Sequence, residues 1–93
     1  MESYGAAEQQ LRIAISLTKN APEDTAKYSN ELCVVLMRAA GLRAAKGDLD
    51  GAQRAYSNAQ EAIVTAIKLN PKEASYRATR SALESVMGGK KPD

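Results

Sequence analysis

Apolar residues recur along most of this chain at steps of three and four, which places their side chains on one face of an α-helix. The pattern is interrupted near Pro22, Gly47 and Pro71. The residue before a proline avoids helical angles, and glycine adopts the left-handed angles that often end a helix. We therefore predict an all-α fold with four helices, over residues 3–20, 22–46, 48–69 and 72–87.

The second predicted helix has two apolar seams instead of one. The first seam is Tyr28, Leu32, Val35, Ala39 and Leu42, and the second is Cys33, Leu36 or Met37, and Ala40. A helix that is apolar on two sides is normally a central one with more than one neighbour. Gly41 costs about 1 kcal/mol relative to alanine inside a helix, so we expect another helix to approach closely there.

The other three helices are each expected to bury one face. In the first helix this face is Ala7, Leu11, Ala14 and Ile15, with Ile13 and Leu17 beside it. In the third it is Ala52, Tyr56, Ala59, Ile63 and Ala66, widened by Ala55, Ala62 and Leu69. In the fourth it is Ala78, Ala82, Leu83, Val86 and Met87.

The connection between the second and third helices is short, so these helices are expected to form an antiparallel hairpin. Gly47 suits a left-handed position after the second helix. Asp48 can cap the third helix, and Asp50 adds negative charge to its first turn. Pro22 in turn suits the first turn of the second helix.

Composition predicts one small domain over residues 1–89, with 90–93 as a disordered tail. Apolar residues make up 44% of the 93 residues, but many of them are alanine, and there is no Phe or Trp. The core is therefore expected to be thin. A chain near the lower size limit for an independent core is often supplemented by association, so we expect a homo-oligomer or a heterocomplex.

Charge and hydropathy exclude several classes of protein. The net charge of +2 has both signs mixed along the chain, which disfavours a nucleic-acid partner. The longest apolar run, residues 32–37, is far below the roughly 20 residues of a membrane span. The N-terminus lacks the hydrophobic segment of a signal peptide, and a single cysteine cannot form an internal disulfide, so we expect a cytoplasmic protein.

Catalytic and metal-binding patterns are missing from the sequence. Without histidine, the chain lacks the commonest general base and metal ligand. Cys33 lies in an apolar run and is interpreted as a buried structural thiol. Asp48 and Asp50 resemble the start of a calcium loop, but alanine stands at 59, where the bidentate Glu would fall. We expect no enzyme, cofactor or metal.

A weak internal repeat relates segments 7–17 and 59–69, which share four identical positions and both lead into Asn, Pro and an acidic residue. The stretch 47–52, Gly-Asp-Leu-Asp-Gly-Ala, with Tyr56, Ala59 and Pro71 after it, resembles the turn and second helix of a tetratricopeptide repeat. That resemblance covers about residues 22–80. It implies antiparallel helical hairpins that hold a segment of another protein.

The chain departs from the tetratricopeptide pattern in helix length. Pro71 follows Ala59 by twelve positions, where the family has about five, so the third helix is longer by two turns. The second helix is lengthened similarly. Gly47, Leu49, Ala52, Tyr56, Ala59 and Ile63 also resemble the microtubule-interacting-and-trafficking domain, a three-helix bundle with a long second helix. Both families bind peptide or helical segments of partner proteins.

The first helix of each tetratricopeptide pair lines the concave groove, which implies that the second helix of this chain carries the partner-binding face. The stripe left free by its two seams is Asn30, Val34, Met37, Gly41 and Ala45, with Arg38 at its edge. The same stripe could simply pack on the first or fourth helix. In such an array the first and fourth helices are unpaired and form its two ends. Neither of these helices has an obvious polar cap.

The function expected from these observations is a non-enzymatic adaptor or small chaperone. It would hold a helical or extended segment of a partner protein. The alternatives are a trafficking-domain-like peptide-binding bundle, a small helical regulator that binds nucleic acid, and a structural subunit of a larger assembly.

Overall fold

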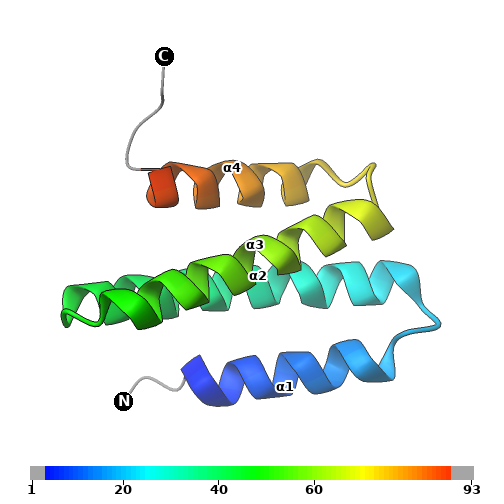
Figure 1. Cartoon of the computed structure of the whole chain (residues 1–93). Helices are drawn as coiled ribbons and strands as arrows, with labels where there is room; N and C mark the ends of the chain where they lie inside the picture. The colour runs from blue at the N-terminus through cyan, green and yellow to red at the C-terminus, as the bar shows by residue number, and fades with distance from the viewer. Residues whose placement is uncertain (1–3, 89–93) are drawn as a thin grey trace.

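The computed structural model describes residues 4–88, and these form four helices. They are α1 (Tyr4–Leu17), α2 (Pro22–Ala45), α3 (Leu49–Leu69) and α4 (Ala74–Gly88), shown in Figure 1. The described part of the chain contains no strand, so the all-α prediction with four helices is confirmed. The tail predicted for residues 90–93 lies outside the described residues.

The centre of the fold is the antiparallel hairpin of α2 and α3, which have the most extensive contact of any helix pair. In Figure 1, α3 crosses in front of α2, while α1 and α4 flank the hairpin on opposite sides. Helix α2 contacts each of the other three, which confirms that it is the central helix. Within the described residues, α1 contacts α2 alone.

The turn between α2 and α3 has the predicted chemistry. Gly47 has φ +89°, in the left-handed region. The backbone N–H of Gly51 donates to Asp48 Oδ1 at 2.9 Å, so Asp48 caps α3 as expected. Pro22 occupies the first turn of α2, where its missing N–H costs nothing.

Two helix ends differ from the prediction by more than one residue. Helix α1 ends at Leu17 instead of residue 20, because the chain turns there: the Thr18 hydroxyl donates to Ala14 O at 2.9 Å and Ala21 N–H donates to Thr18 O at 2.8 Å. Helix α4 begins at Ala74 instead of residue 72. Pro71 and Lys72 form a turn that Glu73 N–H closes on Asn70 O at 3.2 Å.

The core lies mainly between α2 and α3 and is built largely from small side chains. Its main cluster contains Ala26, Leu32, Cys33, Leu36, Ala59, Ala62, Ile63, Ala66, Tyr76 and Leu83. A second, smaller cluster near the hairpin turn contains Ala40, Ala52 and Ala55, and Tyr56 packs against both clusters. Seven of the thirteen buried apolar residues in the described chain are alanines, so the core is thin, as predicted.

The face that α4 buries was predicted correctly for Leu83 and wrongly for the other four residues. Tyr76 and Leu83 are buried, whereas Ala78, Ala82 and Val86 are exposed and Met87 is 40% exposed. Tyr76 and Leu83 are seven residues apart and share one side of the helix. They bury far more apolar area than the alanines can, so they set the rotation of α4.

Candidate functional site

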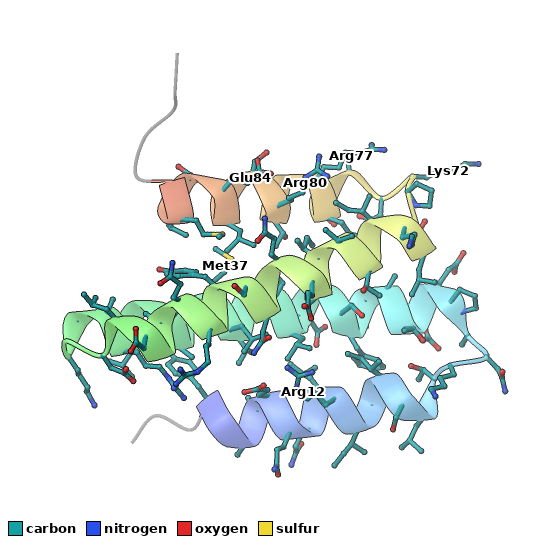
Figure 2. All side chains as sticks on the ribbon, in the orientation of Figure 1. Arg12, Met37, Lys72, Arg77, Arg80 and Glu84 are labelled. Carbon is teal, nitrogen blue, oxygen red and sulfur yellow. The ribbon has the colours of Figure 1, made fainter. Side chains whose placement is uncertain are left out.

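The predicted partner-binding stripe lies on one face of α2, but its members differ in exposure. Asn30, Val34 and Met37 are half-buried, and Met37 packs against the main core cluster. Arg38, Gly41 and Ala45 are exposed. Figure 2 shows Met37 between the hairpin and α4, so this part of the stripe is occupied by packing within the chain.

Asn30 is also partly buried within the chain. Its Oδ1 atom is buried and accepts no hydrogen bond from the described residues. Such a group costs about 1–3 kcal/mol when it loses water without gaining a partner. Asn30 therefore lies at the buried edge of the stripe and is not part of an open surface.

Gly41 does not mark a close helix approach, which corrects the expectation from the sequence. A Cβ built on Gly41 would meet no described atom within 4 Å, and the residue is exposed. In contrast, a Cβ built on Gly51 would overlap the carboxylate of Asp48 and lie 3.0 Å from Nη1 of Arg43. The glycine that close packing requires is thus Gly51, beside the hairpin turn.

An apolar cleft opens at the end of the hairpin, and we call it the tip cleft. It has a volume of about 250 Å³ and is lined by Ala44, Leu49, Ala52, Gln53, Tyr56 and Met87. In Figure 1, the C-terminal end of α3 runs beside α4, and α3 slopes away from α4 toward the hairpin turn. Leu49, Ala52, Gln53 and Tyr56 of α3 and Met87 of α4 line the cleft at this end.

The tip cleft combines exposed and anchored side chains. Leu49 is 68% exposed and Met87 is 40% exposed, whereas Tyr56 is half-buried against both core clusters. The cap of Asp48 on Gly51 fixes the first turn of α3, from which Leu49 projects. Aliphatic and thioether side chains around an aromatic ring form a surface that adapts to apolar partners.

Sequence reasoning missed most of this cleft. It assigned Tyr56 and Ala52 to the buried seam of α3 and Met87 to the buried face of α4, and it gave Leu49 no binding role. The one signal available was a large apolar residue in the first turn of a helix, just after the capping aspartate.

A larger cleft, of about 400 Å³, lies at the opposite end of the hairpin. It is lined by Ala21, Pro22, Glu23, Asp24, Leu69 and Asn70. Its wall contains two carboxylates and only one large apolar side chain. The tip cleft is therefore the better candidate for an apolar partner, although it is smaller.

Two titratable groups of the described chain, Cys33 and Tyr76, have shifted pKa values. Cys33 is fully buried, as predicted, and burial raises the pKa of its thiol to about 11, so the reactive thiolate is scarce at neutral pH. Burial, followed by the negative charges of Glu73, Glu23 and Glu31, raises the pKa of Tyr76. Residues 4–88 contain no group of three or more metal-ligating side chains.

Among the described residues, none of the helices is both long and apolar enough to cross a bilayer. Comparison with known proteins adds no relative: no protein-family model, no curated protein and no solved structure matches the chain.

Proposed function

We propose that this protein is a non-enzymatic interaction module, an adaptor or small chaperone, that holds an apolar helical segment of a partner protein in the tip cleft. The observation that carries the proposal is the exposure of Leu49 and Met87 around the half-buried ring of Tyr56. Exposed apolar side chains that cluster on a protein surface, unlike those scattered singly, can mark an interaction site.

The size of the tip cleft favours anchoring by side chains. A cleft of about 250 Å³ accommodates one or two large apolar side chains but not a whole helix. A partner helix would therefore lie across the opening and insert residues spaced by three or four positions. An extended segment, which presents alternate residues, fits a single short cleft less well.

The arrangement of the helices also supports a tetratricopeptide-like scaffold. Helices α2 and α4, the first helices of successive pairs in that interpretation, contact each other, while α1 and α3 are not in contact within the described chain. The open part of the predicted stripe, Arg38, Gly41 and Ala45, lies on α2 near the tip and is a second surface that a bound segment could reach. We propose a cytoplasmic location on the sequence alone.

The test is site-specific photocrosslinking in the native cell, with a photoreactive residue at Leu49 or Met87. A matched control carries it at Val64, which is 48% exposed on α3 outside the cleft. The proposal predicts that the same partner is crosslinked from Leu49 and Met87 and not from Val64. Crosslinking from all three positions alike, or from none, would refute a specific tip-cleft partner.

A nucleic-acid-binding function has less support. Arg77 and Arg80 lie along the outer edge of α4 in Figure 2, with Lys72 just before the helix, but Glu84 follows them on the same edge, and Arg80 approaches Glu84 to 3.9 Å. A gel shift with DNA or RNA at low salt, lost as salt rises, would establish this alternative.

A further inference from the structure

The side of the hairpin toward α1 carries a small cleft lined by two arginines, and we call it the arginine cleft. Its volume is about 140 Å³, and the buried side chains of Leu36 and Ala55 give it an apolar wall. Its polar lining comes from three helices: Glu8 of α1, Arg43 of α2, and Arg54 and Asn58 of α3. The tip cleft shares no lining residue with it, and Figure 1 shows α1 and α4 on opposite sides of the hairpin.

The two arginines reach this cleft from different helices. Arg43 lies in the last turn of α2, and its Nη1 atom is 3.0 Å from the point where a Cβ on residue 51 would stand. The glycine at 51 therefore leaves room for the guanidinium beside the first turn of α3. Arg54 follows Gly51 by three positions, which places it on the same side of α3. Both arginines are exposed, so a ligand can reach them from solvent.

The arginine cleft holds more positive charge than its own carboxylate neutralises. Glu8 is the acidic residue that lines it, and Glu8 is already bound to Arg12, with 3.0 Å between Nη2 of Arg12 and Oε2 of Glu8. Figure 2 shows Arg12 between α1 and the hairpin. Within residues 4–88, neither Arg43 nor Arg54 forms an ion pair. Two guanidinium charges in one cleft are thus left without a counterion from the described chain.

The two aspartates near the hairpin turn do not fill this role. Oδ1 of Asp48 accepts the N–H of Gly51, and Asp48 does not line the arginine cleft. Asp50 shares with Arg54 a separate depression on α3 and also lies outside the arginine cleft. The unmatched positive charge is therefore available to an anion from solution.

We propose that the arginine cleft binds a phosphate monoester group, held by the guanidinium groups of Arg43 and Arg54 and by the side-chain amide of Asn58. A phosphate monoester carries a charge of about −1.5 to −2 at pH 7, which balances two guanidinium charges, whereas a carboxylate balances only one. The planar guanidinium donates paired N–H groups to phosphate oxygens, and the carboxamide adds neutral donors. The apolar wall strengthens these interactions because it lowers the local dielectric constant.

The size of the arginine cleft limits what else it encloses. Its volume of about 140 Å³ is well below the roughly 300–1,000 Å³ of clefts that surround a whole small-molecule ligand. The cleft therefore takes the phosphate group and leaves the rest of the ligand in solvent. Two sources present such a group: a phosphorylated side chain of another protein and a small free phosphate monoester.

NMR titration of the isotopically labelled full chain with inorganic phosphate, against chloride at equal ionic strength, tests the phosphate site. Saturable shifts are expected at Gly51, Arg54 and the side chain of Asn58, with dissociation at roughly 1 mM because the site is exposed. Arg43→Gln and Arg54→Gln should each weaken binding by about tenfold or more, because each removes charged hydrogen bonds. Arg38→Gln is the matched control, since Arg38 is an exposed arginine of α2 outside the cleft.

Acetate in the same titration should bind more weakly than phosphate, and circular dichroism should show that all three variants are folded. The absence of saturable shifts up to about 50 mM phosphate would overturn the proposal. So would equal binding of acetate, unchanged affinity in either cleft variant, or an equal loss of affinity in Arg38→Gln.

A second set of titrations separates the two sources of the phosphate group. A short phosphoserine peptide is compared with its unphosphorylated form and with glycerol phosphate. Tighter binding of the phosphopeptide than of glycerol phosphate would assign a phosphorylated protein segment, and equal or weaker binding would assign a free monoester. Failure of both monoesters to bind would overturn the proposal even if inorganic phosphate binds. Because the two clefts share no residue, none of these outcomes bears on the proposed tip-cleft function.

Discussion

The carboxylate of Asp48 accepts a hydrogen bond of 2.9 Å from the backbone N–H of Gly51, and it also fills the space that a side chain at 51 would need. One aspartate therefore caps α3 and requires glycine three positions later. Because Leu49 lies between these residues in the chain, the same contact fixes the rim of the tip cleft. The stability of the first turn of α3 and the position of Leu49 thus depend on one local geometry.

Removing the cap should lower stability by a measurable amount. Asp48→Ala is expected to reduce the free energy of unfolding by about 1 kcal/mol, because the N–H of Gly51 loses its acceptor. Urea denaturation with an unchanged slope is the measurement. Asp48→Asn keeps an acceptor oxygen and should retain most of the stability, whereas equal losses in both variants would contradict the capping role.

Two glycines inside the helices, Gly41 and Gly51, should respond differently to substitution by alanine. Gly41→Ala has open space and is expected to stabilise the protein by up to about 1 kcal/mol through helix propensity. Gly51→Ala has the same propensity gain but displaces the Asp48 carboxylate, so it should give no gain or a loss. We expect the two variants to differ by about 1 kcal/mol or more in urea denaturation. Equal stabilisation by both would mean that the cap accommodates a Cβ.

The thin core should make even a small deletion costly. Ile63 is fully buried in the main cluster, so Ile63→Val is expected to lower the unfolding free energy by about 0.5–1.5 kcal/mol. The neighbouring exposed residue supplies the control, because Val64→Ala should change it by less than about 0.5 kcal/mol. Thermal unfolding followed by circular dichroism can compare the two, and similar shifts in both variants would argue against the assigned rotation of α3.

Alkaline pH should destabilise the protein through Cys33. The pKa of this thiol is about 11 in the folded chain against an ordinary value of 9.0, because burial disfavours the thiolate. Because the folded chain favours the neutral thiol, Cys33 contributes to the free energy of unfolding. This contribution is complete below pH 9 and is lost as pH rises toward 11. Tyr76 has a raised pKa and acts in the same direction at high pH.

Unfolding free energy measured between pH 8 and 11 should therefore fall less steeply in Cys33→Ala than in the wild type. As an independent readout, the wild-type thiol should react with a disulfide reagent only as fast as the chain opens. Rapid reaction under native conditions would show that Cys33 is accessible and would contradict its burial.

Sequence reasoning succeeded where structure is set locally. Pro22, Gly47 and Asp48 act on their own neighbours, so the breaks between helices and the cap of α3 could be predicted from residue type. The rotation of α4 about its own axis could not be predicted in this way, because alanines mark the buried side of a helix only weakly. The deciding residue, Tyr76, buries its ring against parts of the chain that are distant in sequence.

The candidate site was less predictable for a related reason. The stripe from Asn30 to Ala45 follows from the periodicity of one helix, but whether it is open depends on where α4 packs, and Met37 is partly covered as a result. The tip cleft lies at the end of the hairpin where α3 slopes away from α4, and residue spacing does not encode the angle between two helices.

The attachment of α1 to a single neighbour also has a consequence for dynamics. Among the described helices, α1 can separate from α2 without breaking any other helix–helix contact, whereas α2 and α3 can open only by disrupting both core clusters. Backbone amides of α1 are therefore expected to exchange hydrogen for deuterium through a local opening, well before those of the central hairpin. The chain behaves as a stable pair of helices with a more readily detached arm.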